Sequence, residues 1–207
     1  SISTMIEEAK TCTNCELSET RTNVVIGKGR ENAEILLIGE APGRNEDEQG
    51  LPFVGTAGKN LDKFLSVIGL SSEDVYIANI LKCRPPENRD PKPDEIKICT
   101  PWLIKQIEHI KPRVICTLGN YSTKFILSKC DPDHMKSIGG ISALHGKVVT
   151  VVINQTEYKV IPLYHPAALI YNRSLQSQMD EDLITVKKTV EKYTGTPLAK
   201  QKSLSEF

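Results

Sequence analysis

Short apolar runs alternate along the chain with segments in which apolar residues recur every three or four positions. The apolar runs are typical of strands buried on both faces of a sheet, and they cover residues 34–39, 75–80, 113–118 and 158–164. Because helical segments separate these runs, the pattern predicts an α/β protein. We expect a three-layer α/β/α fold with a short, mostly parallel central sheet.

Polar residues and prolines mark where the helices are expected to begin and bend. Thr56 is a predicted N-cap for a helix that ends at Gly69. A second helical pattern spans 96–110 and is expected to kink or restart at Pro101. Asn120 and Ser174 are predicted caps for two further helices, the latter running to residue 193.

The segment 141–153 alternates weakly between apolar and polar residues. We expect it to form a hairpin with the following strand, turning near residues 154–155. The last stretch, 195–207, is polar and lacks periodicity until its final residues. The pattern therefore predicts one domain over residues 1–194, followed by a short C-terminal tail.

Composition indicates an ordinary globular chain. Of the 207 residues, 39% are hydrophobic and 25% are charged, which suits a single packed domain. No apolar run approaches the ~20 residues needed to span a bilayer. The first ten residues lack the basic and apolar regions of a secretory signal. We expect an intracellular, cytoplasmic monomer with no membrane partner.

Net charge argues against binding nucleic acid through bulk electrostatics. The 26 basic residues are balanced by 26 acidic ones, so affinity for DNA has to come from a local patch. One candidate is the stretch 82–92, which contains Lys82, Arg84, Arg89 and Lys92 against two acidic residues. A charged run of this kind is usually only a solvated face.

Four of the six cysteines have an informative spacing. Two form a C-x-x-C pair near the N-terminus, and two lie far along the chain: Cys12, Cys15, Cys83 and Cys99. Such a set can close a tetrahedral site for zinc or hold an iron–sulfur cluster, and spacing alone leaves both open. Unlinked thiols or disulfides are the alternative. Cys116 lies in an apolar strand and is expected in the core, whereas Cys130 is expected to be a surface or loop thiol.

Three polar side chains stand where predicted strands end. Glu40 follows the first strand, Asn79 lies at the end of the second, and His165 follows the fourth. Each of them alone has an ordinary structural explanation, such as capping or a satisfied core amide. The carboxyl ends of parallel strands meet at one sheet edge, so we expect the three to converge on a ligand site. Phe53 lies nearby in a Pro/Gly loop where a core aromatic is not expected.

Four motifs are the most specific features of the chain: GEAPG at 39–43, GLPFVGTAG at 50–58, YIANILKCRPP at 76–86 and HPAAL at 165–169. They resemble those of family-4 uracil-DNA glycosylases, the thermostable iron–sulfur members of the uracil-DNA glycosylase superfamily. The resemblance spans roughly residues 10–190, with the motifs in the family order and the four cysteines in the family positions. Glu40 favours family 4 over the related family 5, which usually has an apolar residue there.

The resemblance implies removal of uracil from single- or double-stranded DNA by base flipping and cleavage of the N-glycosidic bond. Phe53 would stack on the extruded uracil, and Asn79 would accept from its N3–H and donate to its O4. Glu46 would crowd C5 and exclude the methyl group of thymine. Ala41 and Gly43 would complete the substrate pocket. The resemblance also implies one 4Fe–4S cluster on the four spaced cysteines.

The same resemblance assigns the chemistry to two residues. His165 would donate a hydrogen bond to uracil O2 as negative charge develops there. Glu40 would stabilise the sugar cation or orient water. The best-known single-uracil family positions its water with an aspartate where this chain has Ala41, so the residue that handles the water stays open.

Residues 167–173 resemble the segment that wedges into the base stack of DNA. Leu169 or Ile170 would fill the vacated space, with Arg173 on a phosphate.

The C-terminal tail resembles a short motif that docks on sliding clamps. Gln201, Leu204 and Phe207 are spaced at i, i+3 and i+6. A tight turn would bring the leucine and phenylalanine together as an apolar plug, although a plain polar tail is an equally good interpretation.

Three rival functions stay open from the sequence. One is a glycosylase of this fold with another main lesion, such as hypoxanthine. The second is a nucleic-acid-binding protein with a structural four-cysteine site and no catalysis. The third is a zinc-containing nucleotide-binding enzyme.

Overall fold

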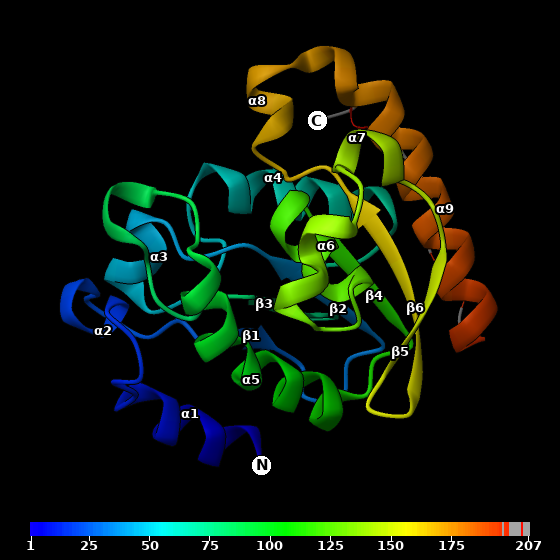
Figure 1. Cartoon of the computed structure of the whole chain (residues 1–207). Helices are drawn as coiled ribbons and strands as arrows, with labels where there is room; N and C mark the ends of the chain where they lie inside the picture. Colours follow the sequence, from blue (N-terminus) through cyan, green and yellow to red (C-terminus); the bar gives the residue numbers. More distant parts are fainter. Residues whose placement is uncertain (196, 199–203, 205–207) are drawn as a thin grey trace.

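A single mixed sheet forms the centre of the molecule (Figure 1). The computed structural model describes residues 1–195, 197, 198 and 204. In these residues the sheet has six strands in the order β1-β3-β2-β4-β6-β5. The strands are β1 (Lys28–Gly29), β2 (Ile35–Gly39), β3 (Tyr76–Asn79), β4 (Val114–Leu118), β5 (Val149–Ile153) and β6 (Thr156–Leu163). Strands β2, β3, β4 and β6 are mutually parallel, which confirms the four predicted strands.

Helices cover both faces of this sheet. The helices are α1 (Ile2–Lys10), α2 (Leu17–Thr20), α3 (Arg44–Gln49), α4 (Thr56–Val67), α5 (Pro93–Ile110), α6 (Asn120–Leu127), α7 (Ile141–Leu144), α8 (Ala168–Tyr171) and α9 (Gln176–Thr194). Short 3₁₀ turns lie at Pro86–Asn88, Pro132–Ser137 and Arg173–Leu175. None of the described helices is long and apolar enough to cross a membrane.

Alternation along the strands divides the core into two layers. Leu36 and Ile38 of β2 pack with apolar residues of α1, α5 and α6. Ile35 and Leu37 point to the other face and pack with α4 and α9. Successive side chains of a strand point to opposite faces, so both faces of β2 are buried. The predicted three-layer α/β/α class is confirmed.

Several predicted helix boundaries are wrong by one or two residues. Thr56 and Asn120 are the first residues of their helices, and the preceding glycines, Gly55 and Gly119, take the N-cap positions. Ser174 lies within a 3₁₀ turn, and α9 begins two residues later. At each of these sites a glycine or a turn sets the start of the helix, and it lies one or two residues away from the polar residue that was predicted to be the cap.

Helix α5 continues through Pro101 without a break, so the predicted restart is wrong. Proline removes one backbone hydrogen bond from a helix. Buried residues on both sides of it, Ile96 and Leu103, pack on the same layer of the core and hold the helix together.

The prediction for 141–153 is correct only for its second half. Residues Ile141–Leu144 form helix α7, and the backbone amide of Ile141 donates to Asn120 Oδ1 at 2.8 Å. Strand β5 pairs antiparallel with β6. The predicted turn is confirmed, because Asn154 and Gln155 both adopt positive φ angles, of 46° and 68°.

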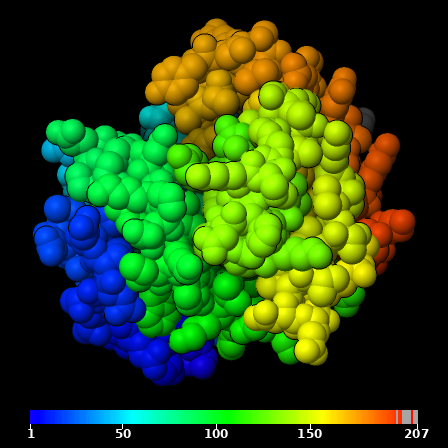
Figure 2. All heavy atoms as spheres, viewed as in Figure 1, coloured from blue at the N-terminus to red at the C-terminus, as the bar shows by residue number. Residues whose placement is uncertain are grey.

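The carboxyl ends of the four parallel strands lie at one edge of the sheet, and the loops that follow them gather there. In the register, Gly39 at the end of β2 pairs with Asn79 at the end of β3. The segment that carries α8 stands over this edge and forms the upper end of the molecule in Figures 1 and 2.

Candidate active site

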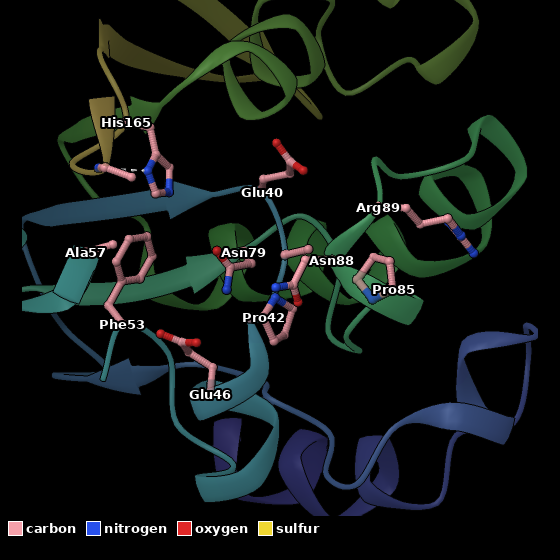
Figure 3. Close-up of a pocket in the computed structure, with 13 residues that line it drawn as sticks. Glu40, Pro42, Glu46, Phe53, Ala57, Asn79, Pro85, Asn88, Arg89 and His165 are labelled. Atoms are coloured by element: carbon pink, nitrogen blue, oxygen red, sulfur yellow. Dashed lines mark hydrogen bonds between the residues drawn. The ribbon is translucent and has the colours of Figure 1, made fainter. Parts of the chain in front are cut away.

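A cavity of about 490 Å³ opens at the carboxyl edge of the sheet (Figure 3). Its walls come from the loops after β2, β3 and β6 and from the segment between α3 and α4. The lining residues are Glu40, Ala41, Pro42, Gly43, Glu46, Phe53, Ala57, Asn79, Pro85, Asn88, Arg89, His165 and Ala167. All seven residues predicted to contact substrate or to act in catalysis therefore line one cavity.

Two glycines allow Phe53 to enter the cavity. Phe53 has a φ of 51°, a left-handed conformation that is uncommon for a bulky residue. A side chain at Gly58 would overlap the Phe53 carbonyl, and one at Gly39 would overlap both the Phe53 ring and the Asn79 amide oxygen. The ring stacks near His165, with centroids 5.8 Å apart and planes inclined by 29°. The aromatic and the amide thus share one narrow site above Gly39.

Asn79 presents its amide side chain to the cavity. The residue is only 2% exposed, yet its amide group forms no hydrogen bond within the described part of the chain. Its backbone carbonyl, in contrast, accepts from Lys82 Nζ at 2.7 Å. Buried amide groups are normally hydrogen-bonded. An amide left open toward a cavity therefore indicates a site for a polar ligand.

His165 is held as one tautomer. Its Nδ1 accepts a hydrogen bond from the backbone N–H of Ala167 at 3.1 Å, so the proton of the neutral ring is on Nε2. Burial lowers the pKa of His165, an effect that the nearby Glu46 carboxylate opposes. A neutral imidazole with an Nε2–H donor follows from this geometry.

Glu46 of α3 supports the loop that carries Phe53. Its Oε1 accepts from the backbone amides of Val54 at 3.2 Å and Gly55 at 3.3 Å. A side chain at Gly43 would approach Glu46 Oε2 to 2.9 Å. Backbone hydrogen bonds therefore hold the Glu46 carboxylate in place at the wall of the cavity.

Glu40 and Asn88 lie on the other side of Asn79 from Phe53 (Figure 3). Burial, together with a smaller contribution from the Asp90 carboxylate, raises the pKa of Glu40 to about 7. Asn88 was missed by sequence reasoning. It has a φ of 55°, and its Oδ1 accepts from Arg84 Nε at 2.7 Å. Such a left-handed asparagine after two prolines is a turn signal, and only the fold shows that the turn faces the cavity.

The four spaced cysteines come together around a second, small cavity. Cys12 and Cys15 follow α1, Cys83 lies in the loop after β3, and Cys99 lies on α5. Arg21 Nη1 donates to Cys83 Sγ at 3.4 Å, and the backbone amide of Lys82 donates to Cys99 Sγ at 3.2 Å. Donors aimed at sulfur suit thiolate ligands.

No group of three or more candidate ligands among the described residues is close enough to hold a single metal ion. A zinc ion requires its sulfur ligands at about 2.3 Å from one point. Four cysteine thiols lining one small cavity are a donor set that an iron–sulfur cluster takes. Cys116 is buried in β4 as predicted. Cys130 lies in the loop after α6 but is half-buried against the core, so its prediction is only partly correct.

Comparison with known proteins relates this site to a family. A family model described as the uracil DNA glycosylase superfamily matches residues 26–186. A type-4 uracil-DNA glycosylase of Archaeoglobus fulgidus is 46% identical over 182 residues, covering 88% of this chain and 89% of the relative. Another, of Saccharolobus solfataricus, is 46% identical over 185 residues, covering 89% and 84%. The chain belongs to the type-4 family of uracil-DNA glycosylases.

The resemblance predicted from the motifs is thereby confirmed. A type-5 uracil-DNA glycosylase of Pyrobaculum aerophilum is 32% identical over 161 residues, covering 70% of this chain and 66% of the relative. The lower identity agrees with the preference for family 4 that Glu40 indicated.

In this type-4 family member, the predicted DNA-contacting residues follow the cavity-lining Ala167 in the chain and line a separate surface hollow. Leu169 and Ile170 are in α8, directly after the cavity-lining Ala167, and Arg173 follows in a 3₁₀ turn. Ile170 is 46% exposed, and Leu169 packs partly on the core. Asn60 of α4 holds the segment by donating to the Pro166 carbonyl at 3.1 Å. The neighbouring Tyr171, 88% exposed, was not singled out from the sequence.

The basic stretch 82–92 of this type-4 family member does not form the surface patch considered from the sequence. Lys82 is fully buried. Arg89 forms two hydrogen bonds with the Glu95 carboxylate, at 3.0 and 2.5 Å. Lys92 lies 3.6 Å from Glu16. The charged side chains of this stretch therefore mostly interact with other residues of the protein itself.

The buried Glu40 carboxyl predicts a pH-dependent stability. Its pKa is about 7 in the folded protein and 4.5 in an unfolded reference, so between these values only the folded state keeps the proton. The free energy of unfolding should therefore fall as pH rises from 5 to 8. Glu40→Gln should stabilise the protein more at pH 8 than at pH 5, as measured by denaturant unfolding. The exposed Glu73→Gln is the control, and an equal effect of Glu40→Gln at both pH values would contradict the prediction.

Proposed function

We propose that this protein hydrolyses the N-glycosidic bond of uracil in DNA, releasing free uracil and leaving an abasic site. One observation carries the proposal: the exits of the parallel strands β2, β3 and β6 bring Glu40, Asn79 and His165, together with Phe53, around a single cavity. Family membership supports the same activity, since two relatives that are 46% identical bear the name type-4 uracil-DNA glycosylase.

Base recognition uses Phe53 and Asn79, which lie together above Gly39. A base inside a duplex cannot reach a cavity of this depth, so the nucleotide is flipped out of the stack. Phe53 stacks on the extruded ring, while the free Asn79 amide accepts from N3–H and donates to O4. Cytosine carries an amino group in place of O4 and would leave the buried amide donor unpaired, which costs about 1–3 kcal/mol. Glu46, Ala41 and Gly43 line the wall beside the base, and Glu46 excludes a methyl group at C5.

Bond cleavage sends the electron pair of the C1′–N1 bond onto uracil. His165 Nε2–H donates a hydrogen bond to uracil O2, where the negative charge collects. This requires the tautomer that the Ala167 amide selects. Positive charge develops on the sugar, and the Glu40 carboxylate stabilises it. Water then adds its hydroxide part to C1′ and gives up a proton.

Two polar groups on one wall are suited to hold that water. The Glu40 carboxylate forms no hydrogen bond with the described residues, and Asn88 lines the same cavity. A water between them would accept from the amide and donate to the carboxylate. Glu40 and Asn88 would therefore position the attacking water, which Ala41 cannot do because it has no polar side chain.

DNA contacts outside the pocket are assigned to α8 and the turn after it. Leu169 or the exposed Ile170 fills the space left by the flipped nucleotide, and Arg173 contacts a phosphate. Arg173 shares a surface hollow with Asn60 and Lys63 of α4, which supports a path for the DNA backbone beside the cavity.

A 4Fe–4S cluster is proposed on Cys12, Cys15, Cys83 and Cys99. When bound, it supplies covalent cross-links between distant segments. The four cysteines join the segment after α1 to the loop after β3 and to α5. Arg21 and the Lys82 amide stabilise the sulfur charge.

The tail is proposed as a sliding-clamp ligand attached to a single domain, 1–194, that acts as an intracellular monomer. Gln201 and Phe207 lie outside the described residues. Leu204 is buried against the core layer of α4 and α9, and its N–H donates to Asp180 Oδ1 at 3.0 Å. Clamp docking therefore requires Leu204 to leave this position.

Replacing Asn79 tests the base-recognition role. Asn79→Ala should lower kcat/KM for excision of uracil from oligonucleotides by roughly 5- to 150-fold, the equivalent of 1–3 kcal/mol. Alkaline cleavage of the abasic product measures this, and the exposed Asn32→Ala is the matched control.

The wild type should release uracil in preference to hypoxanthine or thymine. Full activity in both Asn79→Ala and Glu40→Ala would remove the site assignment, and equal binding of undamaged and uracil-containing DNA without an abasic product would indicate a non-catalytic binding protein.

The cysteine site is tested by a matched pair of serine variants. Cys99→Ser should lose bound iron and visible absorbance and should unfold at lower denaturant concentration, because one ligand of the cluster is missing. Cys116→Ser changes another buried cysteine and should retain its iron. Zinc in place of iron in the wild type, measured by elemental analysis, would rule out the cluster.

Truncation after Lys200 tests the tail. The shortened protein should lose clamp binding in a pull-down or calorimetric titration while excising uracil at the full rate, since the cavity lies elsewhere. Unchanged affinity for the clamp would end this part of the proposal.

A further inference from the structure

Lys82 is a fully buried lysine that the proposed reaction does not use. It is 1% exposed, and it follows β3 by three residues. Its Nζ donates to the backbone carbonyl of Asn79 at 2.7 Å and to Gln106 Oε1 at 2.6 Å. Burying an ammonium group is costly unless hydrogen bonds and opposite charges compensate it. A lysine in this place therefore requires a specific reason.

Gln106 extends the contact into a brace beneath β3. Gln106 of α5 is completely buried, and its Nε2 donates to the Ile26 carbonyl at 2.8 Å and to the Tyr76 hydroxyl at 3.2 Å. Tyr76 is the first residue of β3 and Asn79 is the last. The ammonium and amide groups thus hold both ends of the strand that presents the base-reading side chain.

The other side of Lys82 faces the cysteine site. Its backbone N–H donates to Cys99 Sγ at 3.2 Å, and the next residue is Cys83. Lys82 therefore lies between the two proposed cluster ligands Cys83 and Cys99 on one side and the Asn79 carbonyl on the other.

We infer that Lys82 is a positioning residue that couples the four-cysteine site to uracil recognition by fixing the backbone of Asn79. The inference rests on the proposed function, because it concerns how the base-reading amide is held. Gly39 leaves no free space beside the Asn79 amide, so a small shift of the strand end displaces it from the base. A misplacement of about 1 Å at a reacting site can cost on the order of 10²-fold in rate.

Lys82→Met tests this by removing the charge and both donors at similar length. Two DNA ligands separate its effects: one carries a non-hydrolysable 2′-fluoro-deoxyuridine, and the other carries a tetrahydrofuran abasic mimic. We expect Kd for the first ligand to rise about tenfold or more and Kd for the second to change less than about twofold. Iron content is measured in the same samples, and retained iron with this selective loss is the expected result. Removing the cluster from the wild type should shift the two Kd values in the same selective way.

A double-mutant cycle separates coupling from general destabilisation. In an Asn79→Ala background, Lys82→Met should have almost no further effect on kcat/KM, because both changes act through the same amide. Gln106→Met is the second variant if Lys82→Met does not fold, and it should weaken the first ligand selectively. Thr100→Val, a buried change on α5 outside the network, should leave the ratio of the two Kd values unchanged.

The outcomes distinguish this inference from the proposed function. If the wild type neither binds the fluorinated uracil ligand selectively nor excises uracil, the proposed function is wrong. If the wild type does both and Lys82→Met keeps the wild-type ratio of Kd values, or if the cycle is additive, then Lys82 has only a structural role and the inference is overturned.

Discussion

The close approach of two strand ends at Gly39 is the constraint on which the site depends. The parallel register of β2 and β3 places Gly39 opposite Asn79, and the Phe53 ring enters the space that any larger side chain at 39 would occupy. Hydrogen bonds of the sheet set this register, and apolar packing on both faces of the sheet maintains it. The cavity therefore takes its shape from the rigid part of the fold, which is the arrangement that precise recognition of a small planar ligand requires.

Polar groups inside the protein are satisfied almost everywhere except at this cavity. Lys82 and Gln106 form a closed set of hydrogen bonds beneath β3, and His165 and Glu46 are each held by backbone amides. The Asn79 amide and the Glu40 carboxylate are left open at the cavity. In the described residues no fully buried side-chain polar atom lacks a hydrogen-bond partner, so these two open groups are ones that reach the cavity, where a ligand can pair them.

Helices, strands and the membership of the site were largely predictable, for different reasons. Apolar runs with helical segments between them identified the four parallel strands, because burial on both faces excludes polar residues. Convergence of Glu40, Asn79 and His165 followed from topology alone, since parallel strands end at one edge. Errors occurred where tertiary packing overrides local signals: α5 runs through Pro101, and glycines rather than Thr56 or Asn120 cap their helices.

The fold class, the order of the motifs and the family follow from residue type and spacing along the chain. Which groups touch depends on how the layers pack: Lys82 is buried under Asn79 instead of facing DNA, Asn88 faces the cavity, and the Ala167 amide selects the His165 tautomer. The position of Lys82 among other charged residues in the sequence does not show whether its side chain will be buried or will face solvent. That choice is made by hydrogen bonds to residues far along the chain, such as Gln106, and these exist only once the layers have packed.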